Sequence, residues 1–471
     1  MRFPLLVLFL TVFTSENVVA QNKQFLYGFQ EIPQSLLENP GSDVNFVRHI
    51  GVPFLSGLYV NGGVSNSLIS GLFENDGVDL NTKLQSIILR LNVSDFISIN
   101  EQLDIINIGY KLKNDKDYLS AGFYQEFNLI SYYPKDAAIL FYQGNFDSNG
   151  NIDLSRSHDI NHVRFKSEII GVFHAGISRR INENLSIGAR VKLYSGAFNI
   201  QSSNNKGSIS TRLDQNNNYQ HLLNNVDVTY QSSGLKEISK NTLVGNALKN
   251  VFFGGNLGLG FDVGFTYHLK ENISLLGSVL DLGFITYSKD ITTYKVNGNI
   301  EVNDIGLIEP PIDDTIDYWE NISDDINRQI PKDTIHSTYV SFRSPRINGA
   351  LQYGFGKKTR RQRSTDCPAV NERLSTNYQN EIGLQLYSTV RLNRVQFATT
   401  LYYSRNVADF LKAKITYTAD SFSFSNIGLG FSSQVGKFNL YAAADNLLSY
   451  NDFYKSKKLS INFGMNLIFD K

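Results

Sequence analysis

His158 and His162 stand four residues apart, the spacing at which two histidines on one helix bind zinc. The intervening Asp159-Ile-Asn161 lacks the glutamate that follows the first histidine in metalloprotease helices. The segment also leads into a strand pattern, and residues four apart on a strand are too distant for easy chelation. We therefore expect no metal at this pair.

His174 and Ser178 share one face of a predicted strand over residues 169–180, which is reminiscent of outer-membrane hydrolases. A nucleophilic serine also needs an orienting group and an oxyanion site, and the sequence supplies neither. We interpret both residues as polar lumen residues. The prediction is a protein that is not an enzyme, with no catalytic residues; a hydrolase ranks last among the alternatives.

Two charged stretches and one cysteine thiol are the other candidates for a functional site. Residues 301–333 hold ten acidic residues without calcium-loop spacing, so we expect a solvated loop. The basic run 357–363 could contact lipopolysaccharide phosphates. Cys367 is the only cysteine, which excludes an intrachain disulfide and a thiolate metal site. No cofactor is predicted.

The composition favours β-structure and excludes some partners. Lys plus Arg (44) balances Asp plus Glu (44), and the pI is about 7.1, so nothing points to nucleic acid. Phe (32) and Tyr (25) are frequent while Met (2) and Trp (1) are scarce, which suits strands. One large β domain would account for all 471 residues.

The first twenty residues have the three parts of a secretory signal peptide. Arg2 precedes an apolar run over residues 3–13, and the small residues Val18 and Ala20 precede Gln21. We predict cleavage near Ala20, without lipid attachment because no cysteine follows. Beyond residue 20 no apolar stretch reaches the roughly 18 residues of a membrane helix. The exported chain is then either a soluble β protein or a membrane barrel.

Period-two alternation runs through the chain and favours the barrel. In residues 257–267 the odd positions are Leu, Phe, Val or Tyr, while the even positions are Gly, Asp or Thr. The same pattern occurs at residues 119–129, 185–194, 382–392, 395–403, 427–435 and 459–469. These runs are 9 to 11 residues long. This length matches strands that cross a bilayer and exceeds the mean strand length of soluble proteins, about 5–6 residues.

These runs predict the architecture and the domain organisation. We expect an all-β, transmembrane, antiparallel up-and-down barrel of about 14 strands, since bacterial barrels have even strand numbers. Residues 1–20 form the signal peptide and residues 21–471 one barrel domain, with a plug segment at 21–55 and long loops at 301–335 and 357–377. Tight turns are predicted at 114–117, 181–184, 269–272, 344–346 and 436–437, and short capping or plug helices at 81–91, 135–143, 235–250 and 312–330.

Charged residues on the polar strand faces are the candidates for lumen chemistry, because charge avoids the lipid side of a membrane strand. They would set pore selectivity, or pair with one another and close a packed lumen. The candidates are Arg190, Lys192, Asp262, Gln385 and Arg391.

The last strand carries the most specific local signal. Asn462, Gly464, Leu467 and Phe469 fit the pattern by which the barrel assembly machinery recognises C-terminal strands. The alternative is an ordinary amphipathic strand that contains a glycine. Together with the signal peptide, the pattern predicts a barrel of the Gram-negative cell outer membrane. We expect this barrel to be monomeric and to contact outer-membrane lipid and lipopolysaccharide.

Several blocks resemble a known group of proteins. Residues 27–40, 49–57, 257–267, 281–285, 426–430 and 441–448 look like an uncharacterised family of Bacteroidota outer-membrane barrels. The resemblance implies a FadL-like or PorV-like barrel, distantly similar to the PorP/SprF components of type IX secretion. It implies no catalytic motif.

Two functional hypotheses remain. The first is a non-enzymatic membrane platform for a secretion or cell-surface protein. The alternative is a passive or FadL-like transport barrel for a small or hydrophobic solute. A stable protein partner would favour the platform, and conductance would favour transport.

Overall fold

The computed structural model describes most of the chain. The described residues are 25–143 (except 67, 69, 70 and 73), 153–215, 219–235, 251–303 (except 253), 328, 330, 333–359, 377–420 (except 393), 424, 426–449 and 457–469.

Strands dominate these residues, as the alternation predicts. The strands are β1 (Arg48–Gly51), β2 (Gly57–Val64), β3 (Phe96–Lys111), β4 (Asp117–Tyr132), β5 (Ser157–Asp159), β6 (Phe165–Arg180), β7 (Leu185–Leu213), β8 (Tyr219–Ser233), β9 (Asn256–Lys270), β10 (Ile273–Tyr287), β11 (Ile291–Asn303), β12 (Asp333–Ile335), β13 (Tyr339–Phe342), β14 (Arg346–Thr359), β15 (Asn377–Arg391), β16 (Arg394–Ala408), β17 (Leu411–Asp420), β18 (Asn426–Val435), β19 (Phe438–Asp445) and β20 (Lys458–Phe469). The helices are α2 (Ser35–Glu38), α4 (Leu80–Ile88), α5 (Lys135–Gln143) and the single turn η1 (Leu447–Ser449).

The wall is a closed antiparallel barrel of 14 strands in the described part of the chain, which confirms the predicted fold class. Successive strands pair as neighbours, and β20 closes the ring by pairing with β19 on one side and with β1 and β2 on the other. Two wall positions are shared: β1 and β2 both lie between β20 and β3, and β13 and β14 both pair with β10. The sheet therefore has no free edge around the barrel.

One predicted turn is wrong. Ser344–Arg346 does not reverse the chain, because β13 and β14 pair with β10 in the same direction on either side of it. Pro345 has no N–H to give to a ladder, so the strand breaks there without turning. Arg343, next to the break, is buried.

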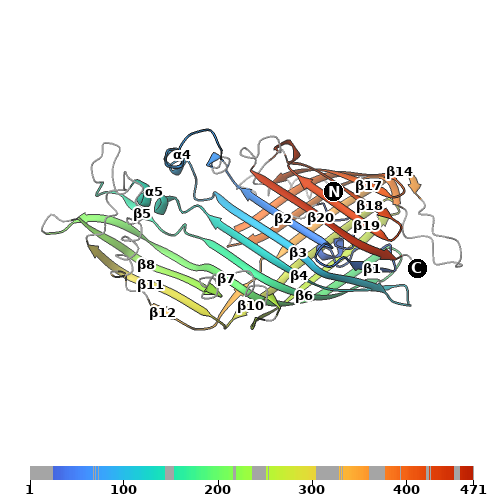
Figure 1. Ribbon diagram of the computed structural model, residues 1–471, viewed down its shortest axis with the longest axis horizontal. Coiled ribbons are helices and arrows are strands. Elements are labelled where there is room, and N and C mark those ends of the chain that lie inside the picture. Colours follow the sequence, from blue (N-terminus) through green and yellow to red (C-terminus); the bar gives the residue numbers. More distant parts are fainter. Residues whose placement is uncertain are drawn as a thin grey trace, which may run out of the picture.

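The two ends of the barrel differ (Figure 1). The tight connections β3–β4, β6–β7, β9–β10 and β18–β19 lie at one end, here named the turn end, together with the end of β20. Because Thr359 pairs with Asn377, the connection after β14 also leaves from the turn end.

Helices α4 and α5 lie at the opposite, loop end, close to the predicted ranges 81–91 and 135–143. Asp79 caps α4 by accepting a hydrogen bond of 2.9 Å from the Thr82 N–H. Apart from residues 235, 328 and 330, the predicted helices at 235–250 and 312–330 lie outside the described residues. In the described residues, no helix combines the length and the apolar character needed to cross a bilayer.

The same sheet extends beyond the wall at the loop end (Figure 1). Strand β7 has 29 residues: it pairs with β9 up to Gly196 and with β8 from Asn199 onwards. Strand β8 then pairs with β11, and β11 with β12, while β5 pairs with β7 near its far end. We name this extension the arm: β5, residues 199–213 of β7, β8, β11 and β12.

The wall strands have an apolar outer face and a polar inner face. On β9, Leu257, Leu259 and Phe261 are 45%, 56% and 41% exposed, while Asp262 and Thr266 are fully buried. The apolar side chains exposed on neighbouring wall strands extend this surface around the barrel. An apolar belt outside and polar groups inside are the arrangement of a barrel that spans a membrane.

A lipid-facing charge provides the test of this orientation. The variant Val263→Arg, in the middle of the outer face of β9, should destabilise the folded barrel by about 2–4 kcal/mol, because the guanidinium would enter the hydrocarbon layer. Urea unfolding in lipid vesicles would measure the loss. Leu269→Arg, on the same strand beside the turn, is the control and should cost only about 0–1 kcal/mol. Equal effects at the two positions would contradict the membrane orientation.

Candidate functional site

The N-terminal segment fills the inside of the barrel. We name residues 25–47 the plug; most of its side chains are buried, and Ile32 and Asn39 are fully so. Wall strands from different sides hold it. Lys414 of β17 donates to the carbonyls of Phe25 and Tyr27 at 3.0 and 2.9 Å.

Other wall strands bind the rest of the plug. The side-chain amides of Gln34 and Asn466 of β20 exchange two hydrogen bonds of 2.9 and 3.0 Å. Ser278 of β10 donates to the carbonyl of Glu38 at 2.7 Å. Because contacts come from β10, β17 and β20, the plug crosses the lumen and does not lie along one wall.

Glycines let the plug backbone approach the wall directly. A side chain at Gly188 of β7 would overlap the backbone of Pro40 and Gly41. A side chain at Gly264 of β9 would overlap Asn39, and one at Gly41 would overlap the backbone of Gly264. The polar-face glycines of the sequence pattern thus make room for the plug.

Three of the five predicted lumen residues, Arg190, Lys192 and Asp262, contact one another next to the plug. Asp262 accepts from Arg190 at 3.2 Å and forms an ion pair with Lys192 at 2.9 Å. All three side chains are at most 1% exposed. Arg190 also donates to the carbonyls of Leu36 and Leu37 in the plug.

Two residues that the sequence analysis did not single out extend this group. Asp281 pairs with Lys192 at 2.6 Å and with Arg346 at 2.7 Å. We name Arg190, Lys192, Asp262, Asp281 and Arg346 the lumen charge cluster. Its three cations face only two carboxylates, and the plug supplies the third, since Glu38 lies 3.6 Å from Arg346. Charge therefore balances only with the plug in place.

A second buried ion group lies among β4, β6 and the break after β13. Arg343 pairs with Glu126 at 2.8 Å and with Glu168, which also pairs with Lys166 at 3.2 Å. A cavity of about 70 Å³ adjoins both groups; most of its lining residues are of polar or charged type, and Tyr59 and Arg391 are among them. This volume accommodates a few water molecules at most.

The other two predicted lumen residues lie apart from the cluster. Gln385 is buried on β15 beside Asn348, at 3.5 Å. Arg391, at the end of β15, reaches across to Asn100 and Ser98 of β3 at 3.1 and 3.4 Å. Arg391 therefore joins opposite walls near the loop end.

His174 and Ser178 lie on β6, His158 lies on β5, and His162 lies in the segment that follows β5. Ser178 donates to the Ser42 carbonyl of the plug at 3.3 Å, and His174 is buried on the same strand. His162 contacts Asp159 at 3.4 Å, while burial, with a smaller contribution from Arg156, lowers the pKa of His158 in the arm. Among the described residues no three metal-ligating side chains come together.

The C-terminal pattern divides between the two faces of β20. Asn462 and Gly464 are buried toward the lumen, whereas Leu467 and Phe469 are half-buried on the other face. Arg48 lies over the Phe469 ring at 4.6 Å. The strand thus has the amphipathic character that both readings of the pattern require.

Asp281 was not predicted as a lumen residue, because a β-bulge changes the face of the strand on which it lies. The β9–β10 register shifts between Val279 and Leu282, and Asp281 has φ +59°. The bulge turns Asp281 to the lumen, against the alternation set by Leu275 and Val279. The signal available in the sequence was a lone charged residue inside a strand that has no other.

Comparisons with known proteins give a family and a set of distant barrels. A model described as "Family of unknown function (DUF5723)" matches residues 40–445. No curated protein matches the chain. Similar solved structures include the Ralstonia pickettii toluene transporter TbuX (9% identity, 93% of this chain and 94% of that chain, TM-score 0.42). They also include a Pseudomonas aeruginosa FadL homologue (8%, 97% and 100%, 0.41) and the Pseudomonas putida toluene transporter TodX (10%, 92% and 92%, 0.37). These identities are too low to carry a substrate over.

Proposed function

Because this chain belongs to the family of unknown function DUF5723, we propose a function from its own geometry: a non-enzymatic outer-membrane barrel that serves as a platform for a secretion or cell-surface protein. The observation that carries the proposal is the occupied lumen. The plug crosses the lumen and is bound to walls on different sides, Glu38 of the plug lies beside the lumen charge cluster, and the adjoining cavity measures about 70 Å³.

The arm supports the same proposal. A barrel that only anchors or conducts needs no sheet beyond its rim, and loops would suffice to connect its strands. Here β7 runs on for 15 residues, from Asn199 to Leu213, paired with β8. Apolar side chains stand exposed on this sheet, with Leu213, Tyr294 and Ile335 at 41%, 40% and 39%. Such side chains suit contact with another protein.

The resemblance to type IX secretion components suggests the kind of partner. A secretion or gliding component at the outer membrane would find a rigid sheet on the arm. Chain export through the signal peptide and insertion by the assembly machinery belong to this proposal.

The test is a pull-down from native outer membranes solubilised in detergent, with heated and unheated samples compared on a gel. A folded barrel should show heat-modifiable migration and retain a reproducible partner. The triple variant Leu213→Ser, Tyr294→Ser, Ile335→Ser should migrate as the native barrel does and recover at least about tenfold less partner, since truncated interface anchors cost about 2 kcal/mol or more.

Val435→Ser is the matched control, because Val435 is 65% exposed at the turn end, away from the arm. It should retain the partner. Loss of partner from the control as well would contradict docking on the arm. A folded barrel that retains no partner but conducts in planar bilayers would instead support transport of a small or hydrophobic solute.

A further inference from the structure

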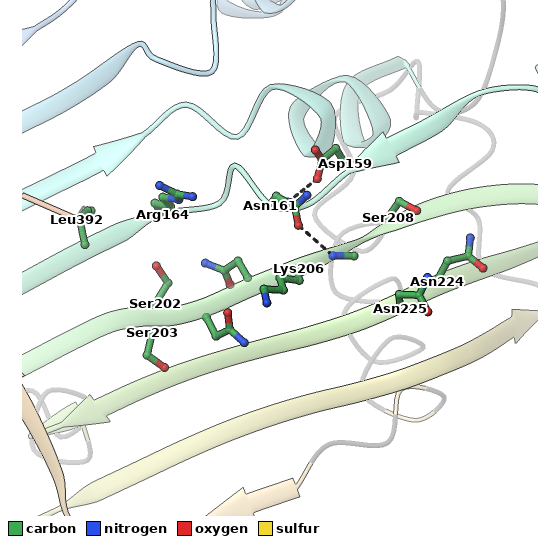
Figure 2. Close-up of a pocket in the computed structure, with 13 residues that line it drawn as sticks. Asp159, Asn161, Arg164, Ser202, Ser203, Lys206, Ser208, Asn224, Asn225 and Leu392 are labelled. Atoms are coloured by element: carbon green, nitrogen blue, oxygen red, sulfur yellow. Dashed lines mark hydrogen bonds between the residues drawn. The ribbon is translucent and has the colours of Figure 1, made fainter. Parts of the chain in front are cut away.

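A large polar groove lies on the arm, outside the plugged lumen. Its volume is about 840 Å³, and it is bordered by β7, β8 and the segment between β5 and β6 (Figure 2). Leu392, at the tip of the β15–β16 hairpin, borders it on another side. The groove belongs to neither ion group in the lumen.

A gap in the hydrogen-bond ladder creates the groove. Strand β6 pairs with β7 only as far as Gln201, and β5 pairs with β7 only from Ser208. Between these positions the edge of β7 has no strand beside it in the described residues. Two register shifts in the β7–β8 ladder fall in this interval, after Ser202 and after Lys206. Bulges that re-aim side chains are frequent beside binding sites.

Side chains fix the segment that spans the gap, residues 160–164. The Asn161 amide oxygen accepts from the Gly207 N–H at 3.1 Å (Figure 2). The Ser202 hydroxyl accepts from the Phe165 N–H at 3.1 Å. Asn205 donates to the Val163 carbonyl. The groove is therefore built by specific bonds.

The lining selects a hydrophilic ligand. Of 13 lining residues, eight are asparagine or serine, and Leu392 is the single large apolar one. Ligand pockets of this size are usually lined mainly by apolar side chains. Amides and hydroxyls both donate and accept, so they match a ligand with many hydroxyl groups.

The charges in the groove favour an anion. Arg164 and Lys206 both line it, and the lone acidic residue of the lining, Asp159, is bonded to the Asn161 N–H at 2.7 Å and lies 3.4 Å from His162. Asp227 stands opposite Lys206 in the ladder, but its carboxylate accepts from the Asn204 amide. The two cations are thus available to a bound carboxylate or phosphate.

We propose that this groove binds an acidic oligosaccharide, whose hydroxyls meet the amides and whose acid group lies between Arg164 and Lys206. The inference goes beyond the platform function and does not require it. An acidic peptide fits less well, because the lining offers one apolar contact for side chains and many partners for hydroxyls. The sugar could come from lipopolysaccharide or from a free polysaccharide.

The test is calorimetric titration of the purified barrel in detergent with defined probes. The probes are trigalacturonate, lipopolysaccharide core oligosaccharide, neutral maltotriose, inorganic phosphate and a tri-aspartate peptide. Binding of trigalacturonate or of the core oligosaccharide, tighter than that of the other three, supports the proposal, and which of the two binds identifies the source. The double variant Arg164→Gln, Lys206→Gln should weaken it at least about tenfold, since it removes charge-assisted hydrogen bonds.

Lys113→Gln and Lys270→Gln together form the control, which removes two exposed charges at the turn end. This variant should bind as the native chain does. Equal binding by the groove variant, no binding of either acidic sugar, or equal or tighter binding of the peptide would overturn the proposal. Heat-modifiable migration of each variant establishes that it is folded, and Ser203→Asp, which adds a repelling charge, provides an independent second variant.

Discussion

Replacing Asp281 with asparagine should lower the free energy of unfolding by about 3–5 kcal/mol, which is the cost of leaving buried cations without their partner. Asp281 is 2% exposed and contacts Lys192 at 2.6 Å and Arg346 at 2.7 Å. Its loss would leave the three cations of the lumen charge cluster with Asp262 and, from the plug, Glu38. Urea unfolding of the barrel in lipid vesicles measures the change.

Asp115→Asn is the matched control, because the Asp115 side chain is 62% exposed in the β3–β4 turn and should contribute little. The double variant Asp281→Asn, Lys192→Met should recover part of the loss, since one orphaned cation is removed with its carboxylate. A single variant as stable as the native chain would show that water enters the cluster and screens it.

Gly188→Leu should displace the plug from the wall. The new side chain would overlap the backbone of Pro40 and Gly41, which cannot move without unseating the segment. Over-packing costs about 1–3 kcal/mol, and 1.4 kcal/mol corresponds to a tenfold change in population. The population of the open state, in which the plug is detached from the wall, should therefore rise by about tenfold or more. A thiol at Ser35, which is 3% exposed, reports the opening through maleimide labelling.

The labelling uses Cys367→Ser with Ser35→Cys, so that the probe is the single thiol of the chain. Gly349→Leu is the control, because nothing lies within 4 Å of a Cβ atom added at that position. Labelling should stay slow in the control and become at least about tenfold faster in Gly188→Leu. Slow labelling in both folded variants would mean that the plug can shift within the lumen without opening.

The wall was predictable because lipid imposes a strict rule on it. Residues 257–267 must alternate, since each strand has hydrocarbon on one face and a crowded polar interior on the other. The same rule located Arg190, Lys192 and Asp262 on the inner face. The sequence did not decide whether these three residues pair with one another. Such pairing depends on the register between strands that are distant in the chain, and that register is set only when the barrel closes.

The arm could not be predicted by the same means. Residues 199–213 are mostly polar, with Asn and Ser at both odd and even positions, so their composition is that of a loop. A strand that has water on both faces does not need apolar residues at every second position, so it shows no period-two pattern. Its stability comes from the ladder with β8 and from continuity with the wall. The bulge at Asp281 was hidden for a related reason, since one extra residue reverses the alternation beyond it.

The closure of the ring by β20 imposes an order on folding. The plug directly precedes β1, and β1 and β2 find their second neighbour only in the last strand of the chain. Pairing across more than 400 residues comes late, after local hairpins have formed. Once that seam joins, the wall is closed around the barrel axis, so we expect the N-terminal segment to lie inside already when the C-terminal strand docks. Biogenesis of this protein is therefore expected to pass through an open, C-shaped sheet wrapped around its own N-terminus.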